Sequence, residues 1–241
     1  MVIVSGVMTA AGGRLARGFA RRARALIPVR FGSLRRLSPV SREFGYDRGQ
    51  PIDRYYIERF LAANTELIKG RVLEIGDRGY TRRFGGTRVT RSDVLNINPG
   101  HSETTIVGDL ATADHIPSDS FDCLVITQTL QLIYDLPAAV KTLHRILSPG
   151  GTLLTTFPGI TPLSQDRWAD TWYWALTPLS AGRLFGDVFG LDNVEVTAHG
   201  NVLTSVAFLE GLATRELRGK ELSLDDPQFP MLITVSALKP L

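Results

Sequence analysis

The segment Arg71-Val72-Leu73-Glu74-Ile75-Gly76 decides the fold class of this chain. It is a short apolar run that stops at a glycine, which is the pattern of a strand buried in a parallel sheet. Similar runs predict further strands at 88–95, 104–107, 121–127, 152–157, 194–198 and 231–238. Helical spacing of apolar residues predicts helices at 51–69, 136–147, 178–189 and 202–217. This alternation predicts an α/β fold, in which helices cover both faces of a mostly parallel sheet.

The composition is that of an ordinary globular α/β protein, with 44% hydrophobic and 21% charged residues among 241. No apolar run approaches the roughly 20 residues of a membrane-spanning helix. The single cysteine, Cys123, excludes an intrachain disulfide and is expected in the core of its strand. No cysteine and histidine residues have metal-ligand spacing, so we expect no metal site. A reducing, cytoplasmic location is the default expectation.

Charge divides the chain into two parts. Residues 1–42 contain nine arginines and no acidic residue, which leaves 18 basic and 24 acidic residues in 43–241. We therefore expect a basic N-terminal extension at 1–42 and a mildly acidic domain at 43–241. The extension has the composition of a loosely ordered segment. Alternatively, residues 14–26 form a basic amphipathic helix that touches an anionic membrane surface or nucleic acid, or the segment is an organellar transit peptide.

Five short motifs follow one another between about residues 70 and 160. They are Val72–Gly76, the acid Asp93 near the end of the second strand, Gly108-Asp109-Leu110, the run from Ile116 to Asp122, and the run from Leu143 to Gly151. In this order and spacing they resemble the motifs of class I S-adenosylmethionine-dependent methyltransferases, in particular the type 11 group. The resemblance implies a Rossmann-like, seven-stranded sheet with an antiparallel C-terminal strand, S-adenosylmethionine as the cofactor, and methyl transfer as the activity.

The resemblance also assigns roles to residues. Glu74 lies near the cationic end of the cofactor, Asp93 accepts hydrogen bonds from the ribose, and Asp109 accepts one from the adenine amino group. Glycines at 76 and 79 let the backbone approach the ligand. The full cofactor-binding set is Glu74, Gly76, Asp77, Gly79, Asp93, Val94, Asp109, Leu110 and Gln128. Alternatives stay open for the three acids: Glu74 as the partner of an arginine, Asp93 as the start of a turn, and Asp109 as a helix cap.

One segment departs from the family pattern. Arg78 and Tyr80 stand where the family usually has glycines, and only eight residues separate Gly79 from Arg88. The helix after the first strand is therefore reduced to about one turn. A dinucleotide needs the N-terminus of that helix for its pyrophosphate, whereas S-adenosylmethionine carries no phosphate. The short connection argues against NAD as the cofactor. It also means that the loop beside the cofactor differs from the usual loop of the family.

The acceptor site is expected on either side of these motifs. Residues 45–56 are dense in polar and aromatic groups, and by resemblance such a segment caps the cofactor and forms a substrate wall. Tyr46, Arg48 and Tyr56 are the candidates there, with Asp53 beside them, although a plain helix with capping residues is the alternative. All three tryptophans lie within 168–174, where aromatic faces interleaved with polar groups suit a sugar ring. The candidates there are Arg167, Trp168 and Trp172, and the alternative is a lid or dimer contact.

Methyl transfer to a hydroxyl needs a base within hydrogen-bond reach of the acceptor. The catalytic candidates are His199, Asp170 and Tyr173, and the sequence does not choose among them. His199, at a predicted strand end, has a structural role as its alternative.

We therefore expect O-methylation of a sugar, a glycan or another small hydroxylated acceptor. The preference for a glycan rests on resemblance to a bacterial methyltransferase group associated with polysaccharide genes. The acidic domain argues against nucleic acid as a partner. The alternative function is a non-catalytic domain that binds a partner or membrane through residues 1–42. The sequence indicates no oligomeric state.

Overall fold

The structure is a computed structural model that describes residues 30, 32–164 and 169–241. The chain divides into two compact units, Met1–Ser38 and Pro39–Leu241. The described part of the first unit contains one short turn, Gly32–Leu34. The amphipathic helix considered for residues 14–26 lies outside the described residues.

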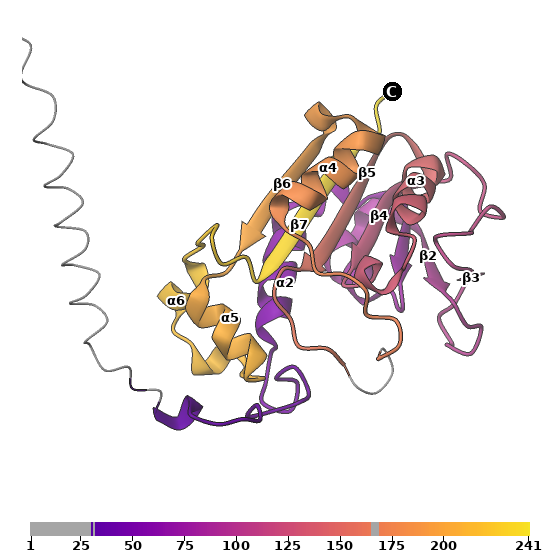
Figure 1. The fold of residues 1–241 in the computed structure, drawn as a ribbon. Coiled ribbons are helices and arrows are strands. Elements are labelled where there is room, and N and C mark those ends of the chain that lie inside the picture. The colour runs from indigo at the N-terminus through magenta and orange to yellow at the C-terminus, as the bar shows by residue number, and fades with distance from the viewer. Residues whose placement is uncertain (1–29, 31, 165–168) are drawn as a thin grey trace, which may run out of the picture. The chain divides into compact units, whose positions relative to one another are not determined.

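A seven-stranded sheet forms the centre of the second unit (Figure 1). Its strands are β1 (Gly70–Ile75), β2 (Val89–Asn96), β3 (Ile106–Val107), β4 (Phe121–Thr127), β5 (Leu147–Pro158), β6 (Val194–His199) and β7 (Leu232–Leu238). Their order across the sheet is β3-β2-β1-β4-β5-β7-β6. The neighbours from β3 to β5 run parallel, whereas β7 runs antiparallel to both β5 and β6. The predicted fold class, including the antiparallel C-terminal strand, is confirmed.

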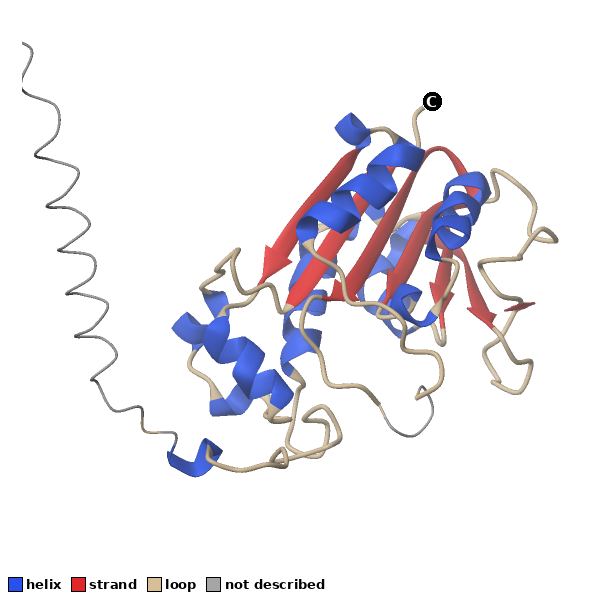
Figure 2. Cartoon of the chain, viewed as in Figure 1, coloured by secondary structure: helices blue, strands red, loops and turns tan. Residues whose placement is uncertain are grey.

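Helices cover both faces of this sheet (Figure 2). Helices α3 (Leu136–Ile146) and α4 (Pro178–Phe189) pack on one face, and α2 (Ile52–Ala63), α5 (Val202–Leu209) and α6 (Gly219–Ser223) pack on the other. Strand residues alternate between the two cores: Leu124 of β4 joins the first, and its neighbours Cys123 and Val125 join the second. Because both faces are buried, the central strands are rich in apolar residues, which is why the sequence showed them clearly.

The predicted single helix over 202–217 is wrong. Helix α5 ends at Leu209, and Gly211 then adopts a φ of 70°, which turns the chain toward the separate helix α6. The apolar spacing continues past this break, because Leu212 and Leu217 still pack against the core. Periodicity alone could not show the break, since the buried residues beyond it are held by turns and not by one helix.

The connection after β1 is more helical than the sequence predicted. A π-helical turn, Thr81–Gly85, is followed directly by a 3-10 turn, Gly86–Arg88, before β2 begins at Val89, so the expected reduction to about one turn is wrong. None of the described helices combines the length and apolar character that crossing a membrane requires.

Candidate functional site

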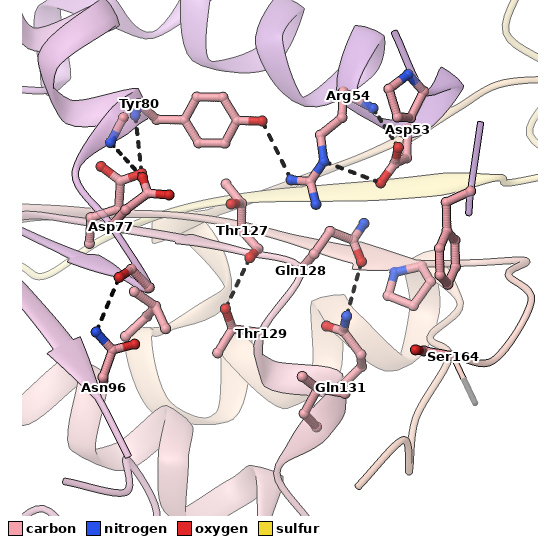
Figure 3. Close-up of a pocket in the computed structure, with 18 of the residues that line it drawn as sticks. Asp53, Arg54, Asp77, Tyr80, Asn96, Thr127, Gln128, Thr129, Gln131 and Ser164 are labelled. Carbon is pink, nitrogen blue, oxygen red and sulfur yellow. Dashed lines mark hydrogen bonds and ion pairs between the residues drawn. The ribbon is translucent and has the colours of Figure 1, made fainter. Parts of the chain in front are cut away.

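A cavity of about 1310 Å³ lies at the carboxyl ends of the parallel strands (Figure 3). The last residues of four strands line it: Ile75 of β1, Asn96 of β2, Thr127 of β4 and Pro158 of β5. The segment that leads into α2 and the loop after β5 supply further lining residues. Parallel α/β sheets bind ligands at this edge, so the topology itself positions the site.

Glu74, the last but one residue of β1, is a buried carboxylate in the lining of this cavity. One of its oxygens accepts a hydrogen bond from the Tyr80 N–H at 3.1 Å, and the other accepts from the Thr81 N–H at 2.8 Å. Burial nevertheless raises the pKa of Glu74 to about 7. No arginine bonds to it in the described part of the chain, so the two backbone N–H groups are its bonded partners there.

Backbone geometry after β1 leaves room for a ligand. Gly76 has a φ of 88°, and a side chain there would project into open space. Asp77 accepts a hydrogen bond from the Gly79 N–H at 2.7 Å, which closes a tight turn. All three residues line the cavity, in agreement with their predicted place.

The two residues that replace the family glycines behave differently from each other. Arg78 is absent from the described lining of the cavity and contacts Glu103 in the β2–β3 loop. Its backbone N–H donates to Glu103 Oε2 at 3.3 Å, and its Nη2 donates to the Glu103 carbonyl at 3.1 Å. Tyr80 does line the cavity, and its hydroxyl accepts from Arg54 Nη1 at 3.4 Å. Because the arginine side chain is drawn to Glu103, it does not fill the space beside Gly76.

Asp93 is not at the cavity, so its predicted role at a ribose is not supported. It lies inside β2, opposite Leu73 of β1, and its carboxylate is buried between Arg71 (Nε to Oδ2, 2.7 Å) and Arg91 (Nε to Oδ2, 3.1 Å). These arginines lower the pKa of Asp93 despite its burial. Val94 is buried and likewise absent from the lining. The reason is length: β2 continues three residues beyond Asp93.

Asn96 occupies the strand-end position that the sequence analysis gave to Asp93. Its Nδ2 donates to the Gly76 carbonyl at 3.1 Å and to Thr104 Oγ1 at 2.8 Å, which fixes the orientation of the amide. The amide oxygen is therefore turned away from those two acceptors and is free to accept.

Two further cofactor candidates lie where they were expected. Asp109 and Leu110 line the cavity, although Asp109 also caps a turn by accepting from the Ala111 N–H at 2.9 Å. Asp109 thus stands at the cavity and also caps a turn, and its contact with the adenine amino group stays a prediction.

Gln128 follows β4 and also lines the cavity, with an unusual φ of 46°. Its side-chain oxygen accepts from Gln131 Nε2 at 3.1 Å, and Figure 3 shows the two amides facing each other. Gln131, which the sequence analysis did not select, is 1% exposed. A non-glycine residue at positive φ is often found at a functional site, because the surrounding structure must hold it there.

The segment before α2 contributes fewer candidates than predicted. Tyr46 lines the cavity, and its hydroxyl accepts from Arg54 Nε at 2.9 Å. Arg48 instead pairs with Glu216 away from the lining. Tyr56 is fully buried, and its hydroxyl donates to the Leu222 carbonyl at 2.9 Å. Arg48 and Tyr56 thus hold the fold, and their prediction as substrate residues is not supported.

The tryptophan-rich segment brings Thr171 and Trp172 to the described lining. The Trp172 ring stacks on Phe44 with centroids 6.1 Å apart and an interplanar angle of 7°. Arg167 and Trp168 lie outside the described residues. Tyr173 is 45% exposed and packs against Tyr134, and Asp170 is exposed; neither of them lines the cavity.

His199 is a structural residue and not a base at the site. Its ring stacks on buried Tyr56 at 5.8 Å, its Nε2 is 3.1 Å from Thr234 Oγ1, and its Nδ1 is 3.7 Å from Asp225. Burial lowers the pKa of His199, which favours the neutral ring. The predicted catalytic candidates are therefore not placed at the cavity.

Charge in the cavity is predominantly negative. Its lining holds five carboxylates (Asp53, Glu58, Glu74, Asp77 and Asp109) and two arginines (Arg54 and Arg83). Arg54 Nε lies 3.7 Å from Asp53, and Arg83 lies 2.9 Å from Glu58, so both arginines are already paired. A cationic or neutral ligand therefore suits this cavity better than a phosphate-bearing one.

Comparison with known proteins agrees with this geometry. Residues 87–155 match the family model described as "Methyltransferase domain". A malonyl-[acyl-carrier protein] O-methyltransferase of Serratia marcescens is 27% identical over 146 residues, covering 56% of each chain. A ubiquinone/menaquinone biosynthesis C-methyltransferase of Haemophilus ducreyi is 38% identical over 69 residues, which are 25% of this chain and 27% of that protein. The chain thus aligns with about half or less of the length of these curated relatives.

Solved structures extend the similarity to more than four fifths of this chain. The N-methyltransferase NodS from Bradyrhizobium japonicum, in complex with S-adenosyl-L-homocysteine, has a TM-score of 0.51 at 13% identity and covers 84% of this chain and 97% of its own. Phosphoethanolamine N-methyltransferase 2 from Haemonchus contortus, with S-adenosyl-L-methionine, has a TM-score of 0.51 at 16% identity, covering 83% and 60%. This chain has the class I methyltransferase fold. The resemblance drawn from the five motifs is confirmed.

Within the methyltransferase fold, the residues that sequence reasoning missed share one property. None of them belongs to a sequence motif, and tertiary structure brings them to the cavity. They are Asn96, Gln131, Arg54 and Phe44. Asn96 could have been predicted from the sequence, because it is the polar residue closest to the end of its strand. No cluster of metal-ligating residues occurs in the described part of the chain.

Proposed function

We propose that this protein is an S-adenosylmethionine-dependent methyltransferase. The observation that carries the proposal is Glu74, a buried carboxylate near the end of β1 to which no arginine of the described residues bonds, in a cavity with an excess of acids. S-adenosylmethionine is a sulfonium cation with an ammonium group in its tail. The methyltransferase fold and the match over residues 87–155 support the same activity.

The residues present fit this cofactor. Glu74 would face its cationic end, and the bare backbone at Gly76 would allow close approach. The free amide oxygen of Asn96 would accept from the ribose in place of Asp93, and Asp109 with Leu110 would hold the adenine. When bound, the cofactor supplies an electrophilic methyl group; the protein's part is to hold the acceptor in line and exclude water.

We further propose that the acceptor is a small hydroxylated molecule of the sugar or glycan type, methylated on oxygen. The Phe44–Trp172 stack supplies an aromatic surface, and the acidic lining disfavours a carboxylate or phosphate acceptor. Asp53 would serve as the base, because it is a buried carboxylate in the lining and burial raises the pKa of Asp53.

The test is transfer of a labelled methyl group from the cofactor to pools of monosaccharides, glycosides and glycans. The parent should label at least one pool, Glu74→Gln should lose labelling, and Asp53→Asn should retain cofactor binding but lose most turnover. Glu66→Gln is the control, because the Glu66 side chain is 83% exposed and lies outside the lining. If the parent labels only amines or carbon acids, the oxygen acceptor is wrong while the methyltransferase activity stands.

A further inference from the structure

Helix α5 is apolar on its outer side as well as on the side that packs against the sheet. The helix contains no charged residue, and Ala207 and Phe208 are buried in the core. Four aliphatic side chains of the same helix are 38% to 53% exposed. They are Val202, Leu203, Val206 and Leu209. At about 100° per residue, these four positions fall within roughly a third of the helix circumference, so they form one stripe, which we call the α5 face.

A fifth aliphatic residue extends the α5 face at the start of the helix. The N-cap residue Asn201 donates from Nδ2 to the Leu224 carbonyl at 2.7 Å, which places Leu224 beside the first turn of α5. The Leu224 side chain is 64% exposed. A surface helix normally turns charged and polar residues outward, and a contiguous apolar surface usually marks an interaction site.

The other end of α5 lies beside the point where the basic segment joins the domain. The N–H groups of Val40 and Ser41 donate to the carbonyl of Glu210, the residue after the helix, at 2.9 and 3.1 Å. Arg42 is exposed, and residues 1–42 contain nine arginines and no acid. The chain therefore connects a long run of positive charge directly to one end of the α5 face.

Acidic residues in the segment after α5 are engaged in contacts of their own. Glu216 pairs with Arg48, Glu221 accepts from the Arg218 N–H at 2.8 Å, and Asp225 accepts from the Gly200 N–H at 2.7 Å. These contacts hold the carboxylates within the fold. They leave the positive charge of residues 1–42 as the dominant charge joined to the α5 face.

This combination favours a lipid surface over a protein partner. Protein interfaces usually depend on tryptophan, tyrosine and arginine side chains in pockets, whereas the α5 face consists of aliphatic side chains only. A second copy bound face to face through α5 would bring two segments of nine arginines together. An anionic membrane suits both features, because its acyl boundary accepts aliphatic side chains and its headgroups attract arginines.

We propose that the α5 face docks on an anionic lipid surface, with the arginines of residues 1–42 attracted to the headgroups. Phe208, on the other side of α5, lines the cavity and packs against Phe44 with ring centroids 6.2 Å apart. Docking therefore holds the helix that forms one wall of the cavity against the lipid. The proposal is independent of the proposed function, because neither the α5 face nor the arginines take part in methyl transfer.

The first experiment is sedimentation of the full chain with lipid vesicles. The parent should partition at least about tenfold more strongly into phosphatidylcholine vesicles that contain phosphatidylglycerol than into pure phosphatidylcholine. The double variant Leu203→Gln/Val206→Gln should partition about tenfold more weakly than the parent, because two aliphatic side chains no longer enter the lipid. Leu179→Gln/Leu191→Gln is the matched control: both leucines are exposed (83% and 72%) at or beside α4, and this variant should bind as the parent does.

A second measurement tests whether the α5 face itself meets the lipid. Val206→Cys is labelled with nitrobenzoxadiazole, whose fluorescence rises and shifts to the blue in an apolar environment; Cys123 is buried and does not compete for the label. The label should respond to vesicles with phosphatidylglycerol. The same label on Leu179→Cys should not respond, because Leu179 lies on α4, at the opposite face of the sheet.

Four results would overturn the proposal. The parent fails to sediment with the anionic vesicles, or the α5 double variant binds them as well as the parent does. A silent label at position 206 on vesicle-bound protein would show that residues 1–42 bind without the α5 face. A parent dimer that Leu203→Gln/Val206→Gln dissociates, measured by analytical ultracentrifugation, would show that a second copy covers the face.

Discussion

At the residue scale, Glu74 combines two opposing effects. Two backbone N–H groups stabilise its ionised form, while burial in the cavity wall destabilises that form more strongly and raises the pKa of Glu74 to about 7. The carboxyl group of the free protein therefore gains a proton as the pH falls through neutrality. A cationic ligand needs the ionised form.

Cofactor affinity should consequently depend on pH. Because the pKa in the free protein lies near 7, the ionised fraction of Glu74 falls about tenfold between about pH 8 and about pH 6, and S-adenosylhomocysteine should bind about tenfold more weakly at the lower pH. Calorimetry at both pH values measures this, and a proton should be released on binding near pH 7. Glu74→Gln should bind weakly and without this pH dependence. A flat profile in the parent would show that Glu74 does not face the ligand.

The comparison of Asp93 with Asn96 shows how far residue-level prediction reaches. The sequence placed an acid near the end of the second strand, which is correct to within three residues. A strand, however, presents successive side chains to opposite faces and ends at one position only, so three residues decide whether a carboxylate meets a ligand or an arginine. Glu74, Gly76 and Asp109 could be placed at the cavity from sequence, because their position is tied to a strand end by a glycine or an adjacent turn. Gln131 and Arg54 could not be found, since their place depends on packing between distant segments.

At the element scale, the two loops beside Gly76 are held together by Glu103. It contacts Arg78 and Arg82 of the loop after β1, with Arg82 Nη2 2.8 Å from Oε1, while its own loop after β2 supplies Ile97 and His101 to the cavity wall. These arginines and the Arg78 N–H lower the pKa of Glu103. The ion-pair network orders a connection that is built of two short helical turns, Thr81–Gly85 and Gly86–Arg88.

Glu103→Gln should therefore loosen both loops and weaken S-adenosylhomocysteine binding about threefold to tenfold, which calorimetry can measure. The matched control is Glu66→Gln, which removes an ion pair to Arg88 whose atoms are 3.5 Å apart, at a residue outside the cavity lining. Unchanged affinity in Glu103→Gln would mean that the loops are ordered without this carboxylate.

The turn after α5 fixes the segment that leads to Phe44 and Tyr46. The Val40 and Ser41 N–H groups donate to the Glu210 carbonyl, and the Cβ of an alanine at Gly211 would lie 2.2 Å from the Ser41 carbonyl oxygen. With the positive φ as well, Gly211→Ala should lower the free energy of unfolding by at least about 2 kcal/mol in urea denaturation. Gly219→Ala, where the added methyl meets no atom within 4 Å, should change it by less than about 0.5 kcal/mol. Equal stabilities would show that the 40–46 segment is not packed this way.

The strands that are most deeply buried were the easiest to predict from the sequence. Both faces of β1, β4 and β5 are covered, so these strands appear as continuous apolar runs. The boundary at Gly211 was hidden because it depends on a contact with residue 41, more than 150 positions away in the chain.

At the scale of the whole molecule, every described residue of the site belongs to the unit Pro39–Leu241. Removal of residues 1–38 should therefore leave S-adenosylhomocysteine affinity within about twofold of the parent. If the basic segment binds anionic surfaces, the truncated protein should lose sedimentation with phosphatidylserine vesicles while the parent retains it. Loss of cofactor binding on truncation would place part of the site in the segment removed.

The central claim is that the cavity binds S-adenosylmethionine. The most direct measurement is calorimetric titration of the full chain with S-adenosylmethionine, S-adenosylhomocysteine and NAD. We expect one molecule of either adenosyl compound to bind per chain with a dissociation constant on the order of micromolar, and no measurable binding of NAD. Absence of binding by both adenosyl compounds, or preferential binding of NAD, would contradict the account.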